Sequence, residues 1–195
     1  MVFLASVIIL TIYGPVFKEE IAYSSDRVGS IRYVIEDVPY NTFVRLLKPV
    51  NTEFSIIIPK IAAVAPIVDK VNPNDPDIYL PALKEGVAHV MDSAYPGDPG
   101  NVYLFAHSSD SFYNVGKYNV VFYLMNKLSQ GDEIYVYYKG SRFKYVVDTV
   151  KVVRPDEINY LSGNPDVKTL TIQTGYPAGM VSKRLILVAN EIGLQ

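Results

Sequence analysis

The segment TLTIQTGYPAGMVSKRLILVA, residues 169–189, contains two apolar, strand-like runs separated by a turn-forming stretch. TLTIQT and RLILVA are rich in aliphatic and β-branched residues, and the Gly and Pro residues between them favour a turn. If the two runs pair as an antiparallel hairpin, Gly175 and Arg184 flank the connecting loop and lie near one another. Side chains alternate along a strand, so Thr174 would point to the face opposite position 175.

The composition predicts one β-rich domain with a short extension. The chain has 195 residues, 49% of them hydrophobic, with 13 Pro and 12 Gly to form turns. The formal net charge is −2 and no basic tract is present, which argues against a nucleic-acid partner. The chain has no Cys, which excludes disulfides, thiolate metal sites and a thiol nucleophile.

Short strand-like runs continue through most of the chain. Residues 54–59 (FSIIIP), 61–68 (IAAVAPIV) and 102–107 (VYLFAH) are apolar and bounded by turn residues. Residues 132–153 alternate in hydrophobicity around Lys139-Gly140-Ser141, which predicts a hairpin. About eight strands in total favour a mainly β fold that closes, or nearly closes, into a barrel.

One or two short helices are expected beside these strands. Residues 118–129 (YNVVFYLMNKLS) have helical periodicity, and Gly86 is placed to end a short helical turn before a strand. Residues 155–161 (PDEINYL) begin with the Pro and acidic residues typical of a first helical turn. Residues 71–77 (VNPNDPD) are interpreted as a loop from their composition. Within them, residues 72–77 could ligate Ca²⁺ in principle but lack the spacing of a calcium-binding loop, so they are interpreted as a solvated turn.

The N-terminal region differs in composition from the rest. Residues 1–17 carry no charge and fit a membrane span, for which roughly 17–25 apolar residues are needed. A signal-peptide core and a buried strand are the alternatives to this transmembrane anchor. Residues 18–50 are expected to form a connector containing a short helix, with Asn41 as its N-cap and Pro49 beyond its end. The folded domain is expected to span residues 51–195.

Few residues are candidates for chemistry. His107 ends a predicted strand, where a histidine hydrogen-bonded to its own loop is the commoner role, and His89 lies in an apolar run and is interpreted as structural. Arg184 begins an apolar strand and fits either a solvated strand end or a clamp for an anion or carbonyl group. The residues after His107 do not indicate a Ser-His-Asp triad, since a serine adjacent to its own base rarely points toward it. These residues are Ser108, Ser109 and Asp110.

Several segments together resemble the sortase family. TLTIQTGYPAG and KRLILVA are similar to the active-site strand, loop and following strand of sortases. Four upstream segments match the same family in the same order: IPKI at 58–61, ALKEGVAH at 82–89, YPGDPGN at 95–101 and LFAHSSD at 104–110. The resemblance covers about residues 54–191. It implies a closed eight-stranded sortase-like β-barrel behind a single N-terminal membrane helix, with the barrel on the extracytoplasmic side.

The resemblance also implies a chemistry. Sortases are membrane-anchored cysteine transpeptidases that need no cofactor. They attack an LPxTG-like sorting signal and pass the acyl group to an amine on the cell wall or on a pilin. His107 matches the family's catalytic His, a general acid and base. Arg184 matches the Arg that holds the substrate and supports the oxyanion. The family's nucleophilic Cys falls on Gly175.

Gly175 departs from the family pattern at the reacting position. Glycine supplies no thiolate, and removing a nucleophile from a catalytic unit can cost on the order of 10⁶ in turnover. We therefore expect no transpeptidation by this chain. A pseudosortase that binds a peptide or partner is the alternative, and a membrane-tethered barrel in which GYPAG is only a turn is a third. A natural variant, a deliberate inactivation and a sequence error would each place a glycine here.

Overall fold

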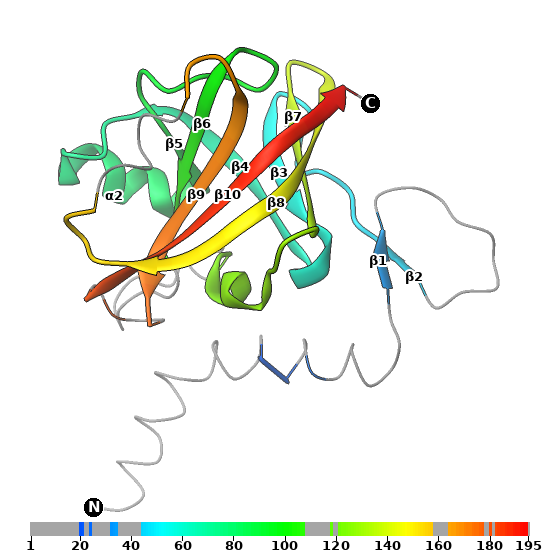
Figure 1. The fold of residues 1–195 in the computed structure, drawn as a ribbon, viewed down its shortest axis with the longest axis horizontal. Coiled ribbons are helices and arrows are strands. Elements are labelled where there is room, and N and C mark those ends of the chain that lie inside the picture. The colour runs from blue at the N-terminus through cyan, green and yellow to red at the C-terminus, as the bar shows by residue number, and fades with distance from the viewer. Residues whose placement is uncertain are drawn as a thin grey trace, which may run out of the picture.

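The computed structural model describes residues 20–21, 24, 32–34, 44–107, 118, 121–157, 164–177, 180 and 182–194. Eight strands form a closed barrel in the order β10-β8-β7-β3-β4-β5-β6-β9 (Figure 1). This confirms the expected mainly β, eight-stranded barrel. The strands are β3 (Phe54–Ile58), β4 (Ala63–Val71), β5 (Val87–Val90), β6 (Gly100–Phe105), β7 (Glu133–Tyr138), β8 (Ser141–Val153), β9 (Lys168–Tyr176) and β10 (Lys183–Leu194).

Two antiparallel pairs follow directly from the sequence pattern. β7 and β8 form the predicted hairpin, in which Tyr138 pairs with Ser141. Lys139 and Gly140 between them have φ values of 48° and 79°, as a two-residue hairpin turn with positive φ at both positions requires. β9 and β10 form the second pair, in which Arg184 is the register partner of Gly175. The hairpin inferred from residues 169–189 is therefore confirmed.

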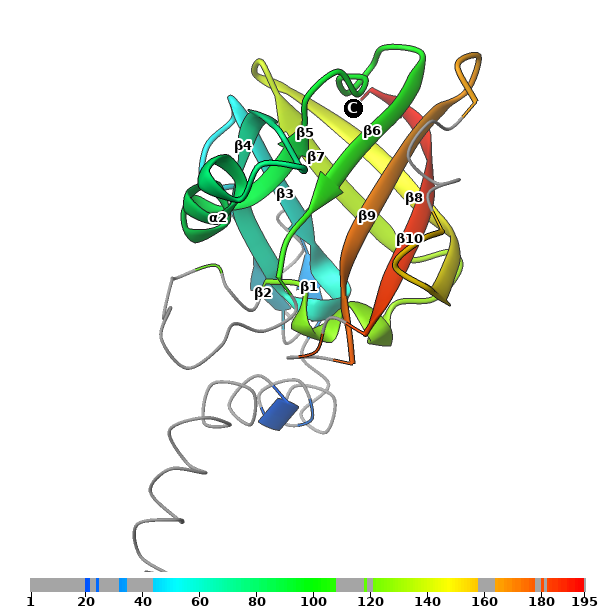
Figure 2. The same ribbon diagram turned by 90° about the vertical axis from the view of Figure 1, so that its left-hand side faces the viewer.

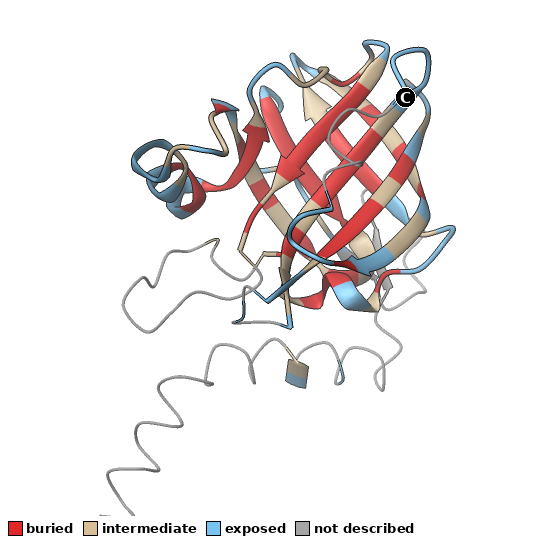
Figure 3. Ribbon diagram, turned by 60° about the vertical axis from the view of Figure 1, so that its left-hand side comes forward, coloured by how far each residue is buried: buried red, intermediate tan, exposed pale blue. Residues whose placement is uncertain are grey.

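The core fills the inside of the barrel. Buried residues lie along every barrel strand and alternate with more exposed ones on β4 and β8 (Figure 3). The largest fully buried side chains include Tyr145, Phe122, Ile56, Ile58, Leu104, Leu170, Ile172 and Leu187.

The helix α2 (Pro76–Glu85) lies outside the barrel, between β4 and β5 in sequence (Figure 2). Asp75 caps it by accepting a hydrogen bond from the Asp77 N–H, with O and N 3.0 Å apart. Gly86 ends it as expected, and a Cβ there would overlap the Pro66 carbonyl oxygen. The predicted loop over residues 71–77 is wrong at both ends: β4 includes Val71, and the helix begins at Pro76 because Asp-Pro is a helix-start signal.

The helix predicted over residues 118–129 is largely wrong. The structure has only a 3₁₀ helix, η2 (Tyr123–Lys127), in the described part of this segment. Leu124 and Met125 are buried, so the apolar spacing reflects one short turn against the core rather than a regular helix. A second 3₁₀ turn, η1 (Pro59–Ile61), joins β3 to β4. Residues 155–156 form a turn, and residues 158–161 of the third predicted helix lie outside the described residues.

The region before the barrel contains two short strands. β1 (Arg32–Val34) and β2 (Val44–Leu46) pair in parallel and form a separate sheet. The short helix expected after Asn41 is therefore wrong over 44–46, because strand pairing outweighs the local capping signal. Residues 1–17, the predicted anchor, lie outside the described residues. Within the described ranges, no helix is long and apolar enough to cross a bilayer.

Candidate functional site

Three neighbouring strands bring the sequence-predicted site residues into one row. β6 runs parallel to β9 with Phe105 opposite Gln173, and the Ala106 N–H donates to the Gln173 carbonyl oxygen with N and O 3.2 Å apart. Continuing that register by two residues places His107 alongside Gly175. Because Gly175 is in turn opposite Arg184, the row His107–Gly175–Arg184 crosses the same end of β6, β9 and β10.

The row lies on the outer face of the barrel. Alternate positions of these strands pack into the core, including Leu104, Ala106, Leu170, Ile172, Leu185 and Leu187. Residues 107, 175 and 184 have the opposite parity, and His107, Gly175 and Arg184 are each half-buried. The row therefore faces the outside of the barrel, and its three residues are partly exposed.

Thr174 points away from this row, as its parity predicts. Its side chain is buried, and its hydroxyl donates to the Ala106 carbonyl oxygen with the two oxygens 2.9 Å apart. Ala106 is thus bonded to β9 through both its N–H and its C=O group. These bonds fix Ala106, the residue before His107, relative to Thr174, the residue before Gly175.

A second polar pair lies on the same face and was missed by the sequence interpretation. The Tyr103 hydroxyl donates to Gln173 Oε1 with the oxygens 2.7 Å apart. Burial raises the pKa of Tyr103 to about 12, and the nearby charge of Arg184 acts in the opposite direction. Tyr103 therefore remains a hydroxyl donor at neutral pH. The alternation of side chains along a strand could have indicated Gln173, because this residue lies two positions before Gly175 and therefore shares its face.

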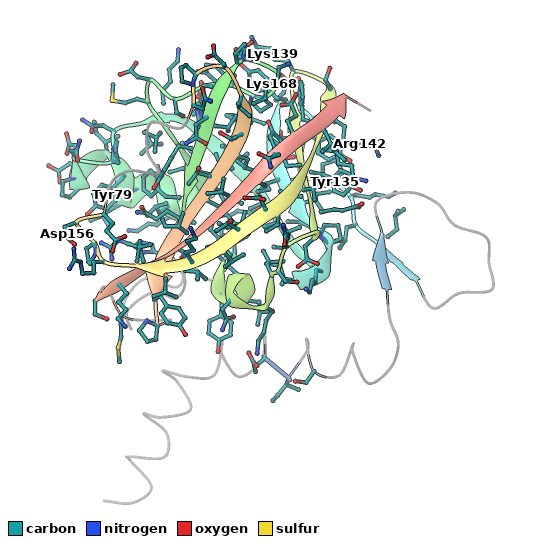
Figure 4. All side chains as sticks on the ribbon, viewed as in Figure 1. Tyr79, Tyr135, Lys139, Arg142, Asp156 and Lys168 are labelled. Atoms are coloured by element: carbon teal, nitrogen blue, oxygen red, sulfur yellow. The ribbon has the colours of Figure 1, made fainter. Side chains whose placement is uncertain are left out.

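α2 borders this face on the β6 side. The rings of Tyr79 on α2 and Phe105 on β6 lie edge to face, with centroids 6.3 Å apart and an interplanar angle of 72°. Tyr79 is labelled on α2 in Figure 4. Phe105 has the same outward parity as Gln173, so the helix covers the part of β6 that lies beside the row.

His89 belongs to a different, buried cluster. Its ring is 1% exposed, with Nδ1 2.8 Å from Asp69 Oδ1 and Nε2 2.9 Å from Ser93 Oγ. This spacing is that of a Ser-His-Asp triad, but Nε2 also lies 3.0 Å from the Ala94 carbonyl oxygen, which can only accept. The Ser93 hydroxyl donates to the Val90 carbonyl instead. Nε2 is therefore a donor and takes no proton from Ser93. The structure agrees with the interpretation of His89 as structural.

No group of three or more His, Asp or Glu residues is arranged to hold a metal ion in the described part of the chain. The polar residues that follow His107 in sequence, Ser108, Ser109 and Asp110, lie outside the described residues.

Comparison with known proteins identifies the family. The Sortase domain model matches residues 56–192. Sortase D of Bacillus subtilis (strain 168) is 28% identical over 138 residues, which cover 69% of this chain and 61% of that protein. The chain belongs to the sortase family, which confirms the resemblance, and it spans about 61% of the length of this curated relative.

Solved structures agree. Sortase C-1 from Actinomyces oris has a TM-score of 0.60 at 27% identity, covering 74% of this chain and 76% of that one. Sortase A from Corynebacterium diphtheriae has a TM-score of 0.60 at 27% identity, with coverages of 77% and 64%. Sortase C1 of GBS Pilus Island 1 has a TM-score of 0.60 at 25% identity, with coverages of 72% and 64%. The barrel described above is thus the sortase fold.

Proposed function

We propose that this chain binds a sorting-signal peptide on the outer face of β6, β9 and β10, and that Gly175 occupies the position of the family's nucleophilic cysteine. The observation that supports the proposal best is the row His107–Gly175–Arg184. It unites, across three strands, the three positions that the family resemblance assigns to base, nucleophile and oxyanion support.

The row has the layout that acyl transfer requires. A thiolate at position 175 would attack the peptide carbonyl while the Arg184 guanidinium stabilises the developing oxyanion from the neighbouring strand. His107, on the other side of position 175, would protonate the leaving amine and later deprotonate the incoming one. The acceptor would be an amine on the cell wall or on a pilin; one structural neighbour carries the name of a pilus island.

With glycine at position 175 this sequence of steps has no beginning. The chain contains no Cys, and Thr174 cannot substitute because its hydroxyl faces inward and is bonded to Ala106. We therefore propose a pseudosortase: a membrane-anchored protein, attached through residues 1–17, that binds the peptide without forming an acyl-enzyme. His107 and Arg184 would then contribute to recognition alone.

The test is an acyl-transfer assay on the full chain, with LPxTG-type peptides and an amine acceptor. We expect product from Gly175→Cys and none from the unsubstituted chain or from Gly175→Ala, which adds a Cβ without a thiol. Turnover by the unsubstituted chain would contradict the proposed inactivity. If Gly175→Cys is inactive and calorimetry detects no peptide binding to either form, the peptide-binding proposal is wrong.

A further inference from the structure

We propose that Gln173 is a peptide-binding residue, whose side-chain amide N–H group donates a hydrogen bond to a backbone carbonyl of the bound peptide. The inference rests on the proposed function, because it concerns the peptide that this function places on β9. Gln173 would be the residue that binds the peptide next to the reacting position.

The position of Gln173 matches the repeat of an extended peptide. Gln173 and Gly175 lie two residues apart on β9 and share its outer face. Two residues of strand rise correspond to roughly 7 Å, the same distance that separates alternate residues of an extended ligand. A peptide that lies along β9 with its reacting carbonyl at Gly175 therefore places a second residue over Gln173.

The Gln173 amide has a defined orientation. Tyr103 donates to Oε1 over 2.7 Å, and Tyr103 is only 3% exposed, so its hydroxyl is held in place by its surroundings. The Oε1 atom is thereby engaged on the β6 side. In the described part of the chain this is the one hydrogen bond of the Gln173 side chain, which leaves the N–H group of the amide as a donor.

The chemistry of the ligand follows from this donor. Gln173 is half-buried, so a ligand that covers it removes water from the amide and must supply an acceptor in exchange. Arg184 acts electrostatically on Tyr103 from the same face. A donor beside the reacting position suits a backbone carbonyl oxygen, which every extended peptide presents at fixed spacing.

A purely structural role for Gln173, as the acceptor for Tyr103, is the competing explanation. Two substitutions separate the roles. Gln173→Glu keeps an oxygen that can accept from Tyr103 but removes the N–H donor, whereas Gln173→Met has similar length and removes both. Under the competing explanation Gln173→Glu binds peptide normally, whereas under the proposal both variants bind it weakly.

The experiment is calorimetric titration of the full chain with an LPxTG-type peptide and with matched peptides in which single backbone carbonyls are reduced to methylene groups. Loss of one hydrogen bond in each case predicts about three- to tenfold weaker binding by Gln173→Glu and Gln173→Met. One reduced peptide should lose a similar factor with the unsubstituted chain and little more with Gln173→Met, because both changes remove the same bond. Thermal unfolding of each variant confirms that it is folded.

The outcomes distinguish this inference from the function on which it rests. If the unsubstituted chain binds peptide and Arg184→Ala weakens binding, but Gln173→Glu and Gln173→Met do not, this inference alone is wrong. If no reduced peptide shows coupling to Gln173→Met although the variant binds weakly, the backbone contact is wrong and a side-chain acceptor replaces it. If the unsubstituted chain binds no sorting peptide, both the inference and the proposed function are overturned.

Discussion

Gly175 on β9 and Arg184 on β10 are register partners, so the Arg184 side chain begins directly beside the one position of the row that has no side chain. His107 follows β6 on the other side of Gly175, and Thr174 anchors the intervening backbone by its bond to Ala106. Among the described residues, the backbone on both sides of position 175 is therefore held by bonds between β6, β9 and β10 that do not involve a side chain at that position.

Arg184 should matter once a nucleophile is present. In a Gly175→Cys background, we expect Arg184→Lys and Arg184→Ala to lower kcat by about 10² to 10³, the usual cost of losing an oxyanion donor. A lysine keeps the charge but loses the planar fork of donors, so it should not restore the rate. Steady-state kinetics of acyl transfer measure this, with the exposed neighbour substitution Lys183→Ala as the control. Full activity of Arg184→Lys would show that only charge is needed.

Thr174 should stabilise the site through the barrel rather than through the ligand. Thr174→Val keeps the shape but leaves the Ala106 carbonyl without its buried partner, which costs about 1–3 kcal/mol of unfolding free energy. Thr174→Ser retains the hydroxyl and should lose less than half as much. Urea unfolding measures both. A Thr174→Val variant as stable as the unsubstituted chain would mean that the hydroxyl bond contributes nothing.

Much of this site follows from the sequence because strand periodicity is short-ranged. A hairpin around residues 169–189 and a period of two are enough to pair Gly175 with Arg184 and to turn Thr174 inward. The position of His107 needed the family resemblance, because the parallel pairing of β6 with β9 joins segments about 70 residues apart in sequence, such as Asn101 and Thr171.

What the sequence did not reveal depends on tertiary packing. The bond from Tyr103 to Gln173 joins two side chains on different strands, and neither residue type suggests it alone. The apolar spacing of residues 118–129 resembled a helix because a single 3₁₀ turn buries residues at the same intervals. The strand at Val44–Leu46 exists because β1 is available to pair with it, which no local pattern predicts.

His89 should be essential for stability and irrelevant to chemistry. His89→Ala removes a fully buried ring and its bonds to Asp69 and Ala94, so we expect a loss of about 3 kcal/mol in unfolding free energy. Ser93→Ala should cost about 1 kcal/mol, because Ser93 is partly exposed. A fluorophosphonate probe should label neither the unsubstituted chain nor Ser93→Ala. Labelling that disappears in Ser93→Ala would mean that Ser93 is an activated nucleophile after all.

Tyr145 on β8 and Glu191 on β10 are joined by a side-chain hydrogen bond. Tyr145 is fully buried, and its hydroxyl donates to Glu191 Oε2 with the oxygens 2.9 Å apart. The same carboxylate oxygen accepts from the Gly97 N–H at 3.1 Å. Tyr145→Phe should therefore lower the unfolding free energy at neutral pH by about 1.5–3 kcal/mol, the range for a bond to a charged group.

The pH dependence of this variant has a definite sign. Burial, followed by the charge and the hydrogen bond of Glu191, raises the pKa of Tyr145 above its ordinary value of 10.0. The unfolded chain ionises this tyrosine near pH 10, before the folded chain does. The contribution of Tyr145 to the unfolding free energy is thus fully present below pH 10 and decreases as the pH rises above 10.

In urea unfolding at a series of alkaline pH values, Tyr145→Phe should lose stability less steeply than the unsubstituted chain. Tyr103→Phe, which removes a tyrosine whose pKa is raised by burial to about 12, should reduce the alkaline loss of stability in the same direction. Identical alkaline slopes for Tyr145→Phe and the unsubstituted chain would show that Tyr145 ionises as readily folded as unfolded.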